Sequence, residues 1–149
     1  MENLTKFQEI EIIYKNAIPK EDRINIRSSK DAFDVLKYVI DDKIEYKEFF
    51  YVILLNNSNE VLGVSKISEG GITSTIVDIR LIFQQALKTH STAIILGHNH
   101  PSGKTEPSTA DKTITEKIKK GAEFLDIKLL DHVIVTSNNY LSFADENIL

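Results

Sequence analysis

The run Phe49 to Leu55 places the strongest constraint on what this chain can fold into. All seven residues of the run are hydrophobic, so neither face of the segment offers polar side chains to water. A strand with one solvated face alternates polar and apolar residues, whereas a strand covered on both faces does not. We therefore predict a central strand, buried on both sides of a sheet.

The segments around this run predict a mixed fold. Polar residues 56–59 form a turn into a second strand, Val61 to Ile67, so the two strands make a hairpin. Periodicity predicts further strands at 92–96, 127–135 and 140–143, and helices at 31–40, 77–88 and 108–124. The first helix is capped by Ser28 or Ser29. The expected fold class is an α/β (α+β) sandwich, with one mixed β-sheet flanked by helices in a single domain.

The first 27 residues carry a different pattern. Phe7 to Tyr14 alternates well enough for an edge strand, and Asn16 to Arg27 is polar and contains Pro19, as a connecting loop does. We predict that residues 1–27 form a strand and loop extension and that residues 28–149 form the domain.

Composition limits the function classes. A length of 149 residues with 42% hydrophobic content suffices for one core. The net charge of −4 argues against sequence-independent binding to duplex nucleic acid, which depends on Lys and Arg. The chain has no cysteine, no apolar run of membrane-spanning length, and no basic-then-apolar order at its start. We expect a soluble, cytoplasmic protein that does not bind a membrane.

Two imidazoles, a hydroxyl and a carboxylate fall within fourteen residues, directly after the predicted strand at 92–96: His98, His100, Ser108 and Asp111. Nitrogen and oxygen donors of this kind suit Zn²⁺, and three protein ligands leave a fourth position for water. Each piece has an ordinary alternative, because Ser108 with Asp111 is also a helix-capping pattern and histidines near a turn are often structural. Their occurrence together favours a metal site.

The spacing His98-x-His100, then Ser108 and Asp111, with an acid upstream, resembles the signature of the JAMM (MPN-type) metalloprotease family. The nearer resemblance is to its bacterial RadC-like branch, over about residues 48–143. It rests on the stretches 98–103, Pro107-Ser108, Asp111 and 131–134, together with Gly71, Arg80 and Ala86. This resemblance implies a JAMM/cytidine-deaminase-like fold. The helix-hairpin-helix region of longer RadC-type proteins is not seen here, so a link to DNA repair is not transferred.

The resemblance also implies residue roles. His98, His100 and Asp111 would hold one Zn²⁺ per chain, and Glu48, at the entry to the buried strand, would be the general base that activates the metal-bound water. Glu45 is the fallback for this acid. Ser108 would hydrogen-bond the tetrahedral oxyanion. The implied activity is that of a zinc-dependent metallopeptidase or isopeptidase-type amide hydrolase.

Two other functions stay open at this point. The chain could be a DNA-repair or replication-associated accessory module with a structural or vestigial metal site, although its acidic charge counts against this. It could also be a phosphodiester hydrolase, although the two-metal sites common in nucleases need more carboxylates. The substrate is expected to be an unidentified peptide or protein, which an exposed edge at Val61 to Ile67 could take by strand addition.

The residues around the metal are also predicted. A ligating imidazole usually donates its second N–H to a carboxylate or carbonyl, and Asp131 and Glu106 are the candidate partners. His132, at the start of an apolar run, is expected to be structural rather than a ligand. Asn99 and Ser102 are expected in a loop beside the cleft.

Overall fold

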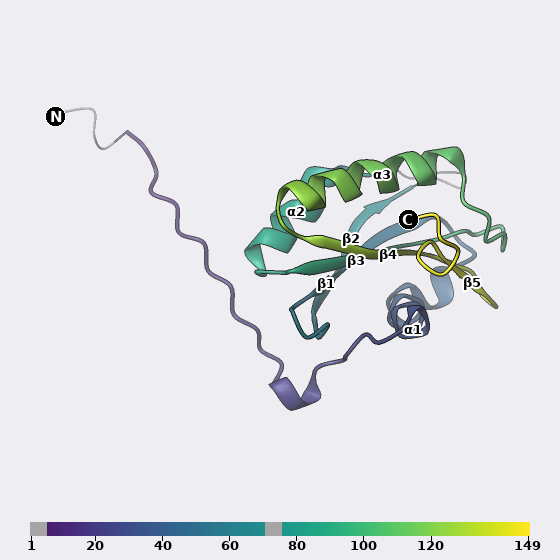
Figure 1. Cartoon of the computed structure of the whole chain (residues 1–149), viewed down its shortest axis with the longest axis horizontal. Coiled ribbons are helices and arrows are strands. Elements are labelled where there is room, and N and C mark those ends of the chain that lie inside the picture. Colours follow the sequence, from purple (N-terminus) through teal and green to yellow (C-terminus); the bar gives the residue numbers. More distant parts are fainter. Residues whose placement is uncertain (1–5, 71–75) are drawn as a thin grey trace.

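The computed structural model of the chain describes residues 6–70 and 76–149 (Figure 1). The described strands form one mixed sheet in the order β2-β1-β3-β4-β5. Its strands are β1 (Phe49–Leu55), β2 (Val61–Glu69), β3 (Ala93–Asn99), β4 (Lys128–Val135) and β5 (Tyr140–Ser142). The predicted hairpin is confirmed, and β1 is buried at six of its seven positions.

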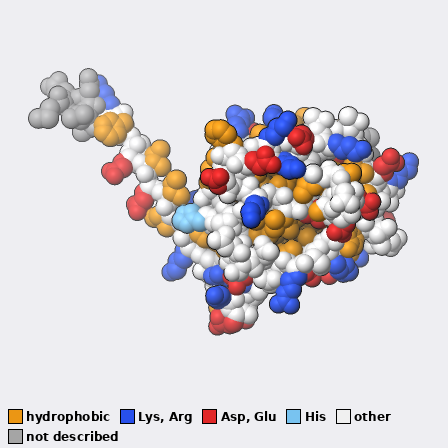
Figure 2. Space-filling model, viewed as in Figure 1, with side chains coloured by type: hydrophobic (Ala, Val, Ile, Leu, Met, Phe, Trp, Pro, Cys, Tyr) orange, Lys and Arg blue, Asp and Glu red, His pale blue; other side chains and the backbone are white. Residues whose placement is uncertain are grey.

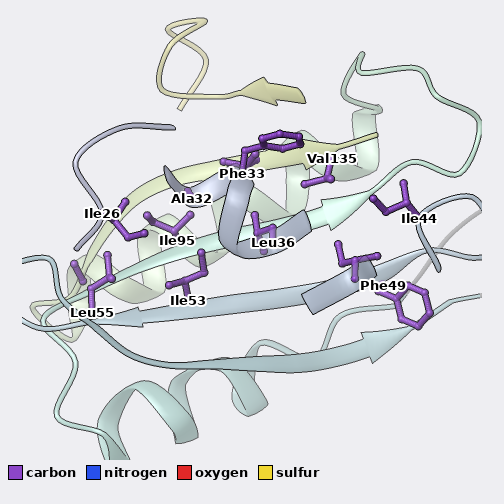
Figure 3. Close-up of a cluster of buried hydrophobic side chains, with 13 residues drawn as sticks. Ile26, Ala32, Phe33, Leu36, Ile44, Phe49, Ile53, Leu55, Ile95 and Val135 are labelled. Atoms are coloured by element: carbon purple, nitrogen blue, oxygen red, sulfur yellow. The ribbon is translucent and has the colours of Figure 1, made fainter. Parts of the chain in front are cut away.

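Helices cover both faces of this sheet. Helix α1 (Ser29–Ile40) lies on one face, and α2 (Ile79–Lys88) and α3 (Thr109–Phe124) lie on the other (Figure 1). Leu36 of α1 packs against Ile53 and Ile95 of the central strands (Figure 3). On the opposite face Ile82 and Ile118 pack against the same strands. The predicted α+β sandwich is confirmed.

The strand directions bring distant segments together at one end of the sheet. Because β1 runs antiparallel to β3, the start of β1 meets the end of β3, with Phe50 opposite His98. The chain then crosses from β3 through α3 to β4, which is parallel to β3. The N-terminus of α3 therefore follows the end of β3 after one short loop. Residues from β1, β3 and α3 can meet there.

Serine caps define the starts of two helices. Ser28 caps α1, and Ser108 caps α3. In each case the carboxylate three residues later, Asp31 or Asp111, closes a capping box by accepting the N–H of the serine. Of the two caps considered for α1, Ser28 is the one used.

Two expectations about the chain are wrong. Residues Phe7 to Tyr14 form no strand, because a strand needs a hydrogen-bonding neighbour and this segment pairs with no described residue. The strand predicted at 92–96 continues as β3 to Asn99, so His98 lies within it and not beyond its end. Gly71 lies outside the described residues. Among the described helices, none is long and apolar enough to cross a membrane.

Candidate metal centre

Four side chains converge at the end of the sheet. Glu48, His98, His100 and Asp111 each place one ligand atom within 4.8 Å of all the others. The Nε2 atoms of His98 and His100 are 2.9 Å apart. Asp111 brings Oδ1 to 3.3 Å from the Nε2 of His98 and Oδ2 to 3.3 Å from the Nε2 of His100. The residues predicted from sequence thus lie together.

This geometry fits a small divalent cation. Two ligand atoms bound at about 2.0–2.1 Å in tetrahedral geometry lie roughly 3.3–3.4 Å from each other, close to the separations of His98, His100 and Asp111. Two imidazole nitrogens that face each other at hydrogen-bond distance repel unless a proton or a cation lies between their lone pairs. The donor set of two nitrogens and one carboxylate is one that zinc accepts.

Each ligand is held by its own element. His98 is fully buried in β3, where the Phe50 ring lies parallel to it at 5.9 Å. His100 follows the strand, and its Nδ1 lies 2.7 Å from the carbonyl oxygen of Lys104. Because a carbonyl only accepts, Nδ1 of His100 carries the proton and Nε2 is free for a metal. Asp111 is in the first turn of α3, where its Oδ2 accepts the N–H of Ser108.

Ser108 is placed by the same capping box. Its Oγ accepts the N–H of Asp111 at 3.0 Å, and the hydroxyl proton is not needed for the cap. The capping interpretation is therefore confirmed, and the hydroxyl stays able to donate a hydrogen bond next to Asp111. Its role in stabilising an oxyanion stays a prediction.

The backbone around Glu48 is held by Asn99, whose structural role was not predicted from the sequence. The Asn99 amide is fully buried, accepts the N–H of Phe49 and donates to the carbonyls of Ile44 and Lys47. It therefore holds the backbone on both sides of Glu48 and does not lie in a loop beside the cleft. Glu45, the fallback, points elsewhere and accepts a hydrogen bond from Ser137.

Glu48 is only 7% exposed, and its Oε1 lies 3.8 Å from the Nε2 of His98. Burial raises the pKa of Glu48, an effect that the imidazoles of His98 and His100 partly offset. A cavity of about 200 Å³ opens beside Glu48 and Asp111 and is otherwise lined by apolar residues, among them Phe50 and Ile114. A raised carboxyl pKa beside such a cavity is what a general base requires.

The other titratable groups favour a cation between them. Burial opposes ionisation of Asp111, but its contacts with the imidazoles of His100 and His98 outweigh it and hold the pKa of this carboxyl well below its usual range. Burial also acts to lower the pKa of His100, yet contact with Asp111 leaves it raised. The site thus concentrates negative charge and imidazole lone pairs at one point.

Behind His98 lies a chain of buried hydrogen bonds. Nδ1 of His98 is 2.7 Å from Nε2 of His132, and Nδ1 of His132 is 2.6 Å from Oγ1 of Thr115. Thr115 donates its only hydroxyl proton to the backbone carbonyl of Asp111 at 2.6 Å. Its oxygen must therefore accept from Nδ1 of His132, which leaves Nε2 of His132 to accept from Nδ1 of His98.

This series of hydrogen bonds sets the tautomer of His98, a candidate metal ligand. Burial holds the pKa of His132 well below its ordinary value, so its ring is neutral and has one acceptor nitrogen. His98 consequently carries its proton on Nδ1 and presents a bare Nε2 to the site. The series also reaches the backbone carbonyl of Asp111, so hydrogen bonds link two candidate metal ligands from different elements.

The partners predicted for the ligating imidazoles were wrong. Asp131 instead accepts hydrogen bonds from Ser142 and from the backbone N–H groups of His132 and Ala144. Glu106 is exposed, and His100 uses the Lys104 carbonyl. His132 is buried and outside the four-residue cluster, as expected of a non-ligand. Thr115 could have been suspected, because it lies four residues after Asp111 on the same helix face.

The fold and this cluster define an α+β domain with a candidate metal centre at one end of its sheet. The chain belongs to the RadC-like JAB domain family, whose model matches residues 26–148. The resemblance drawn from the histidine motif is thereby confirmed.

Curated relatives agree with this assignment. A UPF0758 protein of Flavobacterium johnsoniae is 51% identical over 123 residues, covering 83% of this chain and 53% of the relative. A UPF0758 protein of Chlorobaculum tepidum is 40% identical over 126 residues, covering 85% and 56%. One from Desulfitobacterium hafniense is 40% identical over 116 residues, covering 76% and 51%. The chain spans about half the length of these relatives.

Proposed function

We propose that the protein is a zinc-dependent amide hydrolase of the metallopeptidase or isopeptidase type, acting on a peptide or protein. The observation that carries this proposal is the convergence of a buried glutamate on a cluster of two imidazoles and one carboxylate. Family membership and the cavity beside Glu48 support it. His98, His100 and Asp111 would hold the ion.

A zinc ion bound there would supply a Lewis acid that polarises the substrate carbonyl and acidifies water. Glu48 would accept a proton from the attacking water and deliver it to the leaving amine, which its raised pKa favours. Ser108 would donate its hydroxyl proton to the developing oxyanion. The apolar walls around Phe50 and Ile114 would limit access of other water.

The single cluster favours amide hydrolysis over cleavage of a phosphodiester. In the described part of the chain it is the only group of histidines and acids suited to a metal, and it contains two carboxylates. Hydrolases with two metal ions need bridging ligands for a second ion. No comparable group lies beside this one among residues 6–70 and 76–149.

Elemental mass spectrometry of the purified protein tests the metal site. We expect about one zinc per chain in the wild type and in Glu48→Gln, and loss of zinc in His100→Ala and Asp111→Ala. Hydrolysis of a peptide library should then be lost in Glu48→Gln despite its bound metal, by roughly 10²–10⁴-fold. A wild-type protein that takes up no metal even after reconstitution would overturn the proposal. Full turnover by Glu48→Gln would refute the role of this residue.

A further inference from the structure

The N-terminal arm, residues 7–13, exposes an unusual amount of apolar surface. Phe7, Ile10, Ile12 and Ile13 are 69%, 83%, 71% and 69% exposed. Figure 2 shows hydrophobic and acidic side chains alternating along the arm, which extends away from the domain. β-Branched residues in such a pattern favour a strand, and a strand needs an edge to pair with.

The outer side of β2 offers such an edge. One side of β2 pairs with β1. On the other side only its start is covered, where the N–H of Val61 donates to the carbonyl of Ile24 and the N–H of Ile26 donates to the carbonyl of Asn59. Among the described residues, no further backbone hydrogen bond reaches the outer side of residues 62–67. This part of β2 can accept another strand.

An apolar groove of about 480 Å³ runs beside this edge, between β2 and α1. Val61 and Val64 of β2 line it together with Val35, Tyr38 and Val39 of α1. Side chains of a strand point alternately to the two faces of a sheet. A strand added outside β2 would therefore place every second side chain over the exposed flank of α1, in this groove.

The geometry argues against the arm of the same chain as the occupant of this groove. Direct continuation of the pairing at Ile24 would need extended backbone before it, but the 3-10 turn η1 (Lys20–Asp22), which follows Pro19, interrupts the extended backbone there. The ring of Tyr14 lies 6.2 Å from that of His90, just past the end of α2. Residues 7–13 continue outward from that point (Figure 1).

We propose that the N-terminal arm of one chain adds as a strand to the β2 edge of a second copy, with Ile10 and Ile12 in the groove beside α1. Mutual exchange of two arms gives a two-fold symmetric dimer, the commonest kind of homo-oligomer. The arm and the groove residues together amount to roughly 20 residues on each chain, near the lower end of a specific interface. This proposal does not depend on the metal centre.

Cysteine cross-linking tests the exchange cleanly, because the chain has no cysteine of its own. The Ser65→Cys variant of the 149-residue chain is mixed with the Ile12→Cys or the Ile13→Cys variant and treated with a short bis-maleimide. The two arm variants cover both faces of the added strand. We expect a covalent heterodimer with at least one of them, several-fold above the amount formed between Ser65→Cys and Lys120→Cys. Lys120 is an exposed α3 residue on the other face of the sheet, with a side chain 72% exposed.

The cross-linking results distinguish the arm of a second copy from the arm of the same chain as the occupant of the groove. A chain that carries both Ser65→Cys and an arm cysteine shows whether the cross-link is intramolecular. Cross-links that form only within this doubly substituted chain, at low concentration, would mean that the arm folds back on the β2 edge of its own chain, which overturns the proposal. Absence of any cross-link above the control would also overturn it. In sedimentation velocity the wild type should be dimeric and Ile10→Asp/Ile12→Asp monomeric but still folded, because both side chains are exposed within one chain. A monomeric wild type would again refute the exchange.

Discussion

His98 and His132 lie on adjacent parallel strands with their imidazoles joined by a 2.7 Å hydrogen bond between Nδ1 and Nε2. Only one of the two faces the metal cluster. The other, His132, accepts a hydrogen bond from His98 and donates one to Thr115. The tautomer of His98, a candidate metal ligand, therefore depends on a hydroxyl on α3, which itself contacts no ligand atom of the cluster.

Replacing Thr115 by Val should weaken zinc binding. The variant keeps the shape of the side chain but leaves the Nδ1 proton of His132 without an acceptor, so the ring can turn or change tautomer. We expect a loss of affinity of roughly 10–100-fold, the range found when partners of metal ligands are removed. Competition with a chromophoric zinc chelator measures it.

The matched control is Thr115→Ser, which keeps the hydroxyl and should bind zinc nearly as the wild type does. ¹⁵N NMR of the metal-free wild-type protein should report a protonated Nδ1 on both His98 and His132, a signature that a merely structural role of Thr115 does not require. Equal zinc affinity of the Val and Ser variants would show that the hydroxyl does not act on the site.

The two roles of Ser108 can be separated with glycine. Replacing an N-cap serine by alanine costs about 0.5–2 kcal/mol, whereas glycine costs only a few tenths. Ser108→Gly should therefore unfold in urea nearly as the wild type does, while Ser108→Ala should be about 1 kcal/mol less stable. If the hydroxyl stabilises the oxyanion, both variants lose roughly 10²–10³-fold in turnover. Full activity of Ser108→Gly would reduce Ser108 to a cap.

Much of the site could be predicted because its signals are local. His98, His100, Ser108 and Asp111 fall within fourteen residues, and the capping pattern fixes the last two relative to a helix start. The acid, Glu48, lies fifty residues upstream of His98, and only the resemblance to a family singled it out.

The remaining parts depend on pairings that no local pattern contains. His132 meets His98 because β4 pairs with β3 in one particular register, and a shift by one residue would turn its ring to the other face. Asp131 was predicted to contact an imidazole because of its charge. Strand pairing instead places its carboxylate against Ser142. The Phe7 to Tyr14 alternation did predict strand character, but pairing requires a sheet edge, and this segment pairs with none of the residues that the structure describes.

The stabilising contribution of Glu69 should disappear in acid. Hydrogen bonds from Lys47 and Lys66 lower the pKa of Glu69 from 4.5 to about 2. A carboxyl whose pKa is lower in the folded state contributes stability above its unfolded pKa and loses it as the pH falls towards the folded value. Urea unfolding of wild type and Glu69→Gln should differ modestly at pH 7, because the pair is exposed, and less at about pH 3. A difference that grows in acid would contradict the ion-pair explanation.

Gly97 leaves room for α1 against the strand that carries His98. A Cβ at this position would lie 2.4 Å from both Cδ atoms of Leu36, a fully buried residue of α1. Gly97→Ala should therefore lower the free energy of unfolding by about 1–3 kcal/mol, measured in urea, because strand and helix must move apart. Gly63→Ala is the matched control, since its nearest neighbour, Leu54 Cδ1, is at an ordinary 3.9 Å.

Leu36→Ala alone should cost about 2–5 kcal/mol through the cavity that it leaves. In the double variant, however, Leu36→Ala removes the side chain with which the new Cβ of Gly97→Ala would clash. The double variant should therefore lose less stability than the sum of the losses in the two single variants. Strict additivity would show that this contact does not limit how closely β3 and α1 pack.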